Sequence, residues 1–408
     1  MANTLITPDI ITMQAMVEFK NAMVLLAKTD RQLDKMFTGK IGDTVSVRRR
    51  VRYEAVDGPD ITGLIQDTVE GKIPVSLNLQ KTVPIQFSAI DLTLSIEDFS
   101  ERYIRPAMIE LVQKVESEIA DSYKEIWWFT GTPGAAPSTY LDIGTAEAIL
   151  DDAGVPFDRR TAFYTPFNMV TLADGLKGVF PTGIATLAIE RSSIGNYANF
   201  DVVKSQSLKR HTVGPLGGTP LVDGATQDVT YLSVKDTYNQ TLNTKGWTAA
   251  AAARLNEGDV FTIADVFSVN PRTRQSTGSL QTFVVRVDAS SDVGGLAAVT
   301  IAPPIITSGP YQTVDSAPAD GAAIVIKSGT AGAQYPQNIA FHPNAITVAM
   351  AQIAEPEGGA RFSRQTMDNI SILYTEQHDI LTQQNIKRFD ILFGVKAQNP
   401  GMAIRHTG

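Results

Sequence analysis

The segment Gly42 to Val51, GDTVSVRRRV, decides the fold of this chain. It predicts a β-strand that runs into a turn-rich tip at Asp57-Gly58-Pro59-Asp60, and a return strand follows at residues 73–80. A long hairpin with only one helix beside it buries too little apolar surface to be stable by itself, because isolated two-stranded hairpins are marginally stable in water. We therefore expect the hairpin to pack on another copy of the protein, and an assembly protein is the first hypothesis.

The arginines of this hairpin form the sharpest basic cluster in the sequence. Side chains two residues apart on a strand share a face, so Arg48, Arg50 and Arg52 are expected to lie together. A nucleic-acid patch is one interpretation. The acidic residues nearby favour a second interpretation, in which the arginines form ion pairs within the hairpin and with a neighbouring subunit. Charged side chains on an exposed strand edge also prevent unwanted pairing with other strands. The candidate inter-subunit contact residues are Arg48, Arg50, Arg52, Glu54, Asp57 and Asp60.

A long amphipathic helix is predicted after the hairpin. Pro106 suits its first turn, where a missing N–H costs nothing, and Gly131 is a typical stop signal. About 25 residues would form a rod of roughly 38 Å. Residues 8–37 also carry apolar side chains at helical spacing and predict an N-terminal helix.

The sequence changes character twice beyond the long helix. Residues 145–210 alternate helix and strand, but from about Thr219 to Tyr335 helical periodicity is almost absent. Short strands are predicted there near residues 229–232, 260–263, 281–287, 299–301 and 323–326, and residues 249–253 form a helix-compatible interruption or a linker. The α+β pattern resumes at Ile339. The simplest interpretation is an all-β domain inserted into an α+β domain, because surface loops tolerate insertion.

The composition excludes several classes of protein. The 408 residues are 43% hydrophobic and 19% charged, and the net charge is −8. This negative charge argues against a protein whose main function is to bind nucleic acid, which requires a basic surface. Without cysteine, no disulfide, zinc–thiolate site, iron–sulfur cluster or cysteine nucleophile is possible. Neither a signal peptide nor a run of 18 apolar residues is evident, so we expect a soluble protein, cytosolic when made.

Motifs for catalysis, cofactors or metals are also missing from the sequence. It contains no P-loop, dinucleotide fingerprint, zinc-protease motif or Gly-x-Ser-x-Gly elbow. The scattered histidines are expected to be structural, and they are His211, His342, His378 and His406. We therefore predict that the protein is not an enzyme and that it has no catalytic, cofactor-binding or metal-binding residues.

The order of the predicted elements resembles that of the major capsid protein of tailed double-stranded DNA bacteriophages, whose shell fold is named after phage Hong Kong 97. The likeness rests first on Gly42 to Val47, Ser95-Ile96-Glu97-Asp98 and Tyr103-Ile104-Arg105-Pro106-Ala107. Further likenesses are Phe163-Tyr164-Thr165-Pro166, Val284-Val285-Arg286-Val287 before Thr300-Ile301-Ala302-Pro303, and the ending from Phe393-Gly394-Val395 to Asn399-Pro400. The inserted β domain narrows it to the coat-protein branch typified by short-tailed Salmonella phage. The likeness covers nearly the whole chain, and the order and spacing of the motifs carry it.

The resemblance implies an α+β fold in six parts. They are an N-terminal arm (1–44), an extended hairpin with flanking strands (45–95), a spine helix region (96–131), the first part of a peripheral and axial domain (132–218), an inserted β-barrel (219–335) and the second part of that domain (336–408). It further implies pentamers and hexamers in an icosahedral shell, with a scaffolding protein, a portal protein, and double-stranded DNA in weak non-specific contact. No membrane is implied. The subunits would assemble in the host bacterial cytoplasm, and the mature location would be the virion.

Two alternatives remain open. A cellular nanocompartment with the same shell fold would share the arm, hairpin and spine, but such compartments usually lack an inserted β domain. A hydrolase or sugar-binding protein with a β accessory domain would need convergent polar groups in a pocket, and the sequence has no motif for them.

Overall fold

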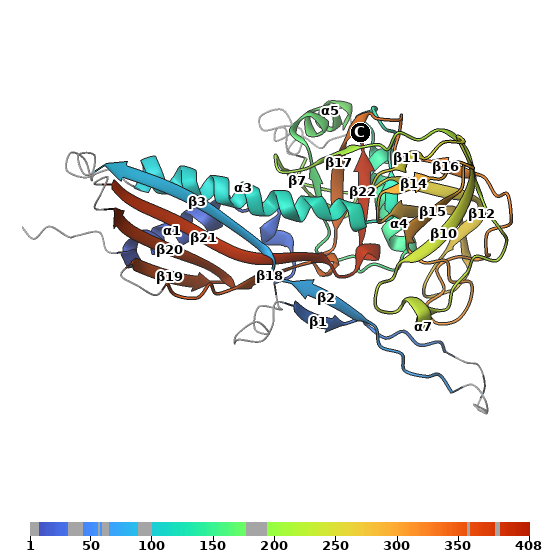
Figure 1. Cartoon of the computed structure of the whole chain (residues 1–408), viewed down its shortest axis with the longest axis horizontal. Coiled ribbons are helices and arrows are strands. Elements are labelled where there is room, and N and C mark those ends of the chain that lie inside the picture. The colour runs from blue at the N-terminus through green and yellow to red at the C-terminus, as the bar shows by residue number, and fades with distance from the viewer. Residues whose placement is uncertain are drawn as a thin grey trace, which may run out of the picture. The chain divides into compact units, whose positions relative to one another are not determined.

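The computed structural model describes residues 8–31, 44–55, 58, 65–88, 100–176, 194–356, 360–379 and 384–408. These residues belong to two compact units, each formed by separate stretches of the chain (Figure 1). The first unit contains residues 1–45, 74–120 and 346–396, and the second contains residues 46–73, 121–345 and 397–408. The segment Ser95-Ile96-Glu97-Asp98 and the candidate residues Asp57 and Asp60 lie outside the described residues.

A five-stranded sheet is the centre of the first unit. Its order is β18-β21-β20-β19, and β3 pairs along β21 in antiparallel register, from Leu79 opposite Phe393 to Ser88 opposite Gln384. The strands are β3 (Leu79–Ser88), β18 (Ile346–Ala351), β19 (Arg361–Met367), β20 (Ile370–Asp379) and β21 (Gln384–Ala397). Helix α1 (Pro8–Ala22) lies against β19 and β20 and buries Met16 and Phe19.

The long helix α3 (Arg105–Asp121) buries the predicted apolar stripe, but it is shorter than predicted. The expected extension to Gly131 is wrong. A 3₁₀ turn, η4 (Ser122–Glu125), follows α3, and β4 (Trp128–Thr130) then pairs in parallel with β22 (Ala403–Thr407). The backbone groups of β4 are satisfied by a strand far away in sequence, which helical spacing alone does not reveal.

The N-terminal helix also ends earlier than the predicted residue 37. After α1, the chain forms the 3₁₀ turn η1 (Leu26–Lys28), and residues 32–37 lie outside the described residues. Glu116 of α3 accounts for the break, because its Oε1 accepts hydrogen bonds from the N–H groups of Val24 and Leu25 at 2.5 and 2.6 Å. An N–H that donates to this buried carboxylate is not free to continue a helix.

A mixed sheet forms part of the second unit, in the order β4-β22-β17-β5-β7-β6, with β8 also paired to β17. The further strands are β5 (Thr161–Tyr164), β6 (Asn196–Tyr197), β7 (Phe200–Lys204), β8 (Arg210–Thr212) and β17 (Gln334–Phe341). Helices α4 (Tyr140–Asp152) and α5 (Pro166–Leu176) share a core with it that includes Leu150, Leu172 and Phe200. This α+β architecture agrees with the predicted class.

A nearly closed antiparallel barrel occupies residues 218–326 of the second unit. Its order is β16-β12-β13-β15-β10-β9, and a bridge between Leu221 and Ala323 brings its two edges together. The barrel strands are β9 (Gly218–Val222), β10 (Gln240–Trp247), β12 (Val260–Val269), β13 (Ser276–Val285), β15 (Ala297–Ala302) and β16 (Ile324–Ile326). Phe261, Ile263 and Phe283 are buried inside it. The predicted all-β character of this region is confirmed.

Two local predictions within the barrel region are wrong or incomplete. The expected strand at 229–232 is instead a loop that leads into the short helix α7 (Tyr231–Val234), since Tyr231 stacks on Tyr311 instead of extending a ladder. The expected interruption at 249–253 leads directly into β11 (Ala252–Leu255), which pairs with β14 (Ala289–Ser291). Local sequence pattern does not report either contact.

The hairpin has the strands β1 (Thr44–Arg48) and β2 (Lys72–Ser76), which form a two-stranded sheet. The predicted return strand at 73–80 is divided, because β2 ends at Ser76 and β3 begins at Leu79. Each half pairs with a different strand, β2 with β1 and β3 with β21, and the break at residues 77–78 lets the chain change partners.

Candidate functional site

Four of the six candidate contact residues lie at the base of the hairpin, residues 46–55 and 65–73. Arg48, Arg50 and Arg52 are exposed while Val47, Arg49 and Val51 are half-buried, so the predicted alternation of faces holds even though β1 ends at Arg48. Arg48 pairs with Glu70 across the hairpin at 3.2 Å, and Glu54 pairs with Arg274 of the barrel at 2.6 Å. Both pairs lie within one subunit.

Arg49 anchors the hairpin to the second unit. Its guanidinium lies 5.0 Å from the ring centre of Tyr238, a cation–π contact, and its backbone N–H donates to the carbonyl oxygen of Gly71 at 2.8 Å. Burial lowers the pKa of Arg49 from its ordinary value, and burial raises the pKa of Tyr238. Arg49 lies on the opposite face of the strand from Arg48, Arg50 and Arg52, and the sequence alone indicates no role for it.

A pair of stacked tyrosines continues this anchor. The rings of Tyr231 and Tyr311 lie 3.5 Å apart and 4° from parallel. The Tyr311 hydroxyl accepts a hydrogen bond from the Arg52 N–H at 3.1 Å and donates to the Val69 carbonyl at 3.4 Å, so one side chain contacts both sides of the hairpin. These tyrosines are more than 150 positions away from the hairpin in sequence, and no local signal could have identified them.

The return side of the hairpin is fixed at two further points. The Lys72 N–H donates to Asp236 Oδ1 at 3.0 Å. Gly71 lies so close to the loop after α7 that a Cβ placed there would be 2.2 Å from the Lys235 carbonyl oxygen. Only glycine permits this approach.

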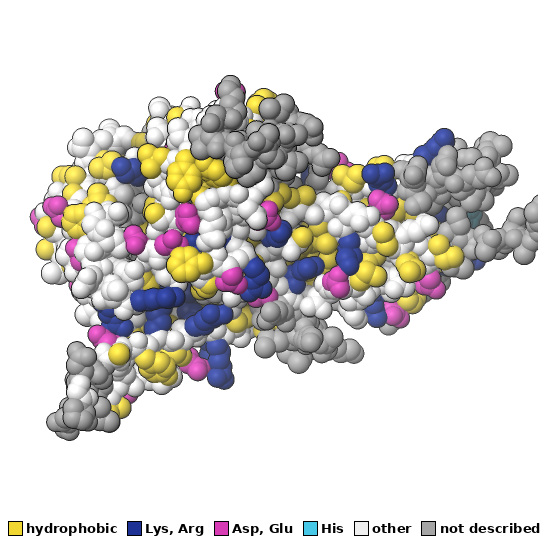
Figure 2. Space-filling view, turned by 180° about the vertical axis from the view of Figure 1, so that it is seen from behind, with side chains coloured by type: hydrophobic (Ala, Val, Ile, Leu, Met, Phe, Trp, Pro, Cys, Tyr) yellow, Lys and Arg dark blue, Asp and Glu magenta, His cyan; other side chains and the backbone are white. Residues whose placement is uncertain are grey.

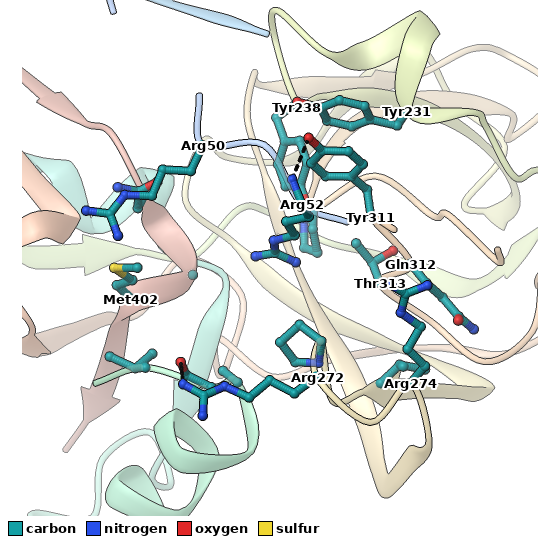
Figure 3. A pocket seen from close by; sticks show the side chains of 18 of the residues that line it. Arg50, Arg52, Tyr231, Tyr238, Arg272, Arg274, Tyr311, Gln312, Thr313 and Met402 are labelled. Carbon is teal, nitrogen blue, oxygen red and sulfur yellow. Dashed lines mark hydrogen bonds between the residues drawn. The ribbon is translucent and has the colours of Figure 1, made fainter. Parts of the chain in front are cut away.

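An open cavity of about 790 Å³ lies beside these contacts, within the second unit (Figure 3). Arg50 and Arg52 line it from the hairpin, and Arg272 and Arg274 line it from the β12–β13 connection. Figure 2 shows Lys and Arg side chains gathered on the face of the molecule near the hairpin. The arrangement concentrates positive charge, which suits an anion or an acidic surface.

A second polar cluster lies in the interior of the second unit. The fully buried Asp259 accepts hydrogen bonds from the N–H groups of Gly214 and Asn256 and lies 2.8 Å from His211 Nε2. Arg405, also fully buried, donates to the Gly258 carbonyl at 2.9 Å, and burial lowers its pKa to about 10. Because these groups are enclosed, they act in stability and do not form an open reaction site.

The described residues contain no group of three His, Asp or Glu side chains placed to hold a metal ion. His211, His342 and His406 are buried in different surroundings, and His378 contacts Asn385 at 2.9 Å. Among the described helices, none is long and apolar enough to cross a membrane.

Comparison with known proteins gives one family and several relatives. A family model described as P22 coat protein, gene protein 5, matches residues 1–408. The major capsid protein of Acyrthosiphon pisum secondary endosymbiont phage 1 is 25% identical over 413 residues, which cover 96% of this chain and 95% of that protein.

Two solved structures illustrate the range of structural similarity. A chain from Mycobacterium phage Che8 is 13% identical, with a TM-score of 0.47, and the match covers 94% of this chain and 90% of that one. The capsid of Ralstonia phage GP4 is 10% identical, with a TM-score of 0.46, and the match covers 93% and 86% of the two chains.

Proposed function

Since the chain belongs to the P22 coat protein family and is a phage major capsid protein, we propose that its hairpin joins neighbouring subunits of the shell. The protein has a structural role in an icosahedral capsid, and its fold is the Hong Kong 97 type with an added β-barrel. The nanocompartment and hydrolase alternatives are not favoured.

The firm anchoring of the hairpin base carries this proposal. Tyr238, Tyr311 and Gly71 hold the base against the barrel region of the same subunit, so this part of the hairpin is already in place before a neighbour arrives. β2 already buries Ile73 and Val75 within the subunit, whereas β1 leaves Thr44, Ser46 and Arg48 exposed, and in a shell adjacent copies would supply a surface for them. The proposed contact residues are Arg48, Arg50, Arg52, Glu54, Asp57 and Asp60.

The pairs Arg48–Glu70 and Glu54–Arg274 refine the role of these residues. Each ion pair is partly exposed, so it contributes only about 0–1 kcal/mol to the stability of the subunit. A neighbour's charges can therefore compete for these groups at little cost. We assign the arm (1–44) to neighbour contacts as well, and the barrel to bracing between subunits.

The remaining partners follow from the role in the shell. The subunits form pentamers and hexamers with a scaffolding protein and a portal protein, assemble in the host bacterial cytoplasm and enclose double-stranded DNA. Contact with DNA is weak and non-specific, because a chain with net charge −8 lacks a basic footprint over its whole surface. No catalytic step is assigned to any residue.

Deletion of residues 52–66 tests the role of the hairpin. The shortened subunit should remain folded by circular dichroism and should form few shells in electron micrographs, with the scaffold present. The matched control is Arg159→Ala, which removes an exposed arginine elsewhere in the second unit. Normal shells from the deletion variant would refute the proposal.

A further inference from the structure

The cavity at the hairpin base has an excess of positive charge. Five arginines line it, and the one carboxylate among its lining residues is Glu54, which pairs with Arg274. Among the described residues, Arg50, Arg52 and Arg272 have no ion-pair partner. The Nε of Arg49 is buried there without a hydrogen-bond partner in the described part of the chain. Three uncompensated guanidinium groups around one hollow create a strong local attraction for an anion.

The backbone that carries these arginines is held in place before any ligand arrives. On the hairpin side, the Arg52 N–H donates to the hydroxyl of Tyr311, whose ring is fixed by stacking on Tyr231. On the barrel side, Asn270 Oδ1 accepts from the Arg272 N–H at 2.9 Å, and the Asn270 carbonyl accepts from the Arg274 N–H at 2.8 Å. A preorganised site loses less entropy when a ligand binds.

We propose that this cavity binds a phosphate group in the unassembled subunit, with Arg52 and Arg272 as its main ligands and Arg50 as a third. The planar guanidinium fork matches two oxygens of a phosphate, which is why arginine is favoured for this group. Figure 3 shows Arg52 and Arg272 extending from different segments of the chain that line this cavity, and the Arg272 guanidinium also donates to the carbonyl oxygen of Gly154 at 3.5 Å. Binding would also join the hairpin to the β12–β13 connection.

The size of the site indicates a small phosphate compound. A volume of about 790 Å³ lies within the range of roughly 300–1,000 Å³ that small-molecule pockets occupy. A duplex would have to approach a chain whose net charge is −8, whereas a small phosphate compound can enter a local basic hollow. The same phosphate chemistry is present in free phosphates and in nucleic acid, so the experiment needs both probes.

The test is calorimetric titration of the full-length subunit, before assembly, with pyrophosphate at constant ionic strength. Saturable binding is expected, and Arg52→Gln and Arg272→Gln should each weaken it by about tenfold, since hydrogen bonds to charged groups are the strong ones. The matched control is Arg48→Gln, which changes an exposed arginine of the same hairpin that does not line the cavity and should bind normally. Circular dichroism confirms that each variant is folded.

A parallel titration with a short DNA duplex distinguishes the sources. Pyrophosphate binding that depends on Arg52 and Arg272, with weaker duplex binding, supports a free phosphate compound. If the duplex binds more tightly than pyrophosphate and depends on the same arginines, the phosphate site is supported and its ligand is a nucleic-acid phosphate. No saturable binding, or equal loss in the Arg48 variant, overturns the proposal. If no phosphate binds and the Arg52 and Arg272 variants only impair shell formation, the partners of these arginines are carboxylates of a neighbouring subunit. The hairpin deletion tests assembly, so the two proposals can fail separately.

Discussion

Glu116 provides the sharpest test of how the N-terminal segment is held on α3. This side chain is 3% exposed, and its Oε1 accepts short hydrogen bonds from the N–H groups of Val24 and Leu25 and a longer one, at 3.4 Å, from that of Leu26. Glu116→Ala would leave the two closest donors, Val24 and Leu25, without their acceptor. A buried donor without a partner costs about 1–3 kcal/mol, so the expected loss of unfolding free energy is about 2–6 kcal/mol. Glu116→Gln keeps an acceptor without the charge and should cost less, about 1–2 kcal/mol, because charge-assisted bonds are roughly twice as strong.

The matched control is Glu118→Ala, two residues along the same helix. Glu118 is one-third exposed and pairs with Lys81 at 2.7 Å, and a partly exposed pair of this kind contributes about 0–1 kcal/mol. Urea unfolding of the unassembled subunit measures the free energies, and hydrogen exchange reports directly on the Val24 and Leu25 amides. The reasoning would be refuted if Glu116→Ala cost no more than Glu118→Ala, or if those two amides kept their protection.

Three other perturbations test the second unit. Burial lowers the pKa of His406 to about 4 from an ordinary 6.5. Between about pH 4 and 6.5, His406 is therefore protonated in the unfolded chain and neutral in the folded protein. Stability should be complete above about pH 6.5 and fall by up to roughly 3 kcal/mol as pH drops to about 4, and His406→Gln should flatten this slope in unfolding titrations. Gly71→Ala should release the hairpin base, seen as faster proteolysis near residues 49–55, whereas Gly224→Ala, which at φ +91° strains only its own loop, should leave that cleavage unchanged. Phe283→Ala should destabilise the barrel by about 3–5 kcal/mol in thermal unfolding, and a change below 1 kcal/mol would contradict its place in the core.

The capsid function and the fold class could be predicted from the sequence because they depend on the order of large features. A charged hairpin, an amphipathic helix and a β-rich insertion each leave a periodic or compositional signal, and these predictions are confirmed. Element ends were less predictable. Gly131 is a good helix stop, but α3 ends ten residues earlier because β4 pairs with a strand near the C-terminus.

The candidate site was predictable only on the hairpin side. Arg50 and Arg52 stand out in the sequence as a local cluster, whereas Tyr231, Tyr311 and Arg272 reach them through the fold. The role of these arginines as neighbour contacts stays a prediction. The domain boundaries inferred from the resemblance also stay predictions, although the barrel strands fall between Gly218 and Ile326.

The strands of the sheet in the first unit lie far apart in sequence, which affects how this unit folds during translation. Its sheet is built around β21, which pairs with β3, β18 and β20, and β21 begins only at Gln384. At about 5–20 residues per second, translation from the end of α3 to that point takes roughly 13–50 s. The barrel, by contrast, is contiguous in sequence and can form during that interval. An incomplete chain therefore carries a finished barrel but an unfinished first unit, so this unit can engage the partners of the capsid protein only after β21 has been synthesised.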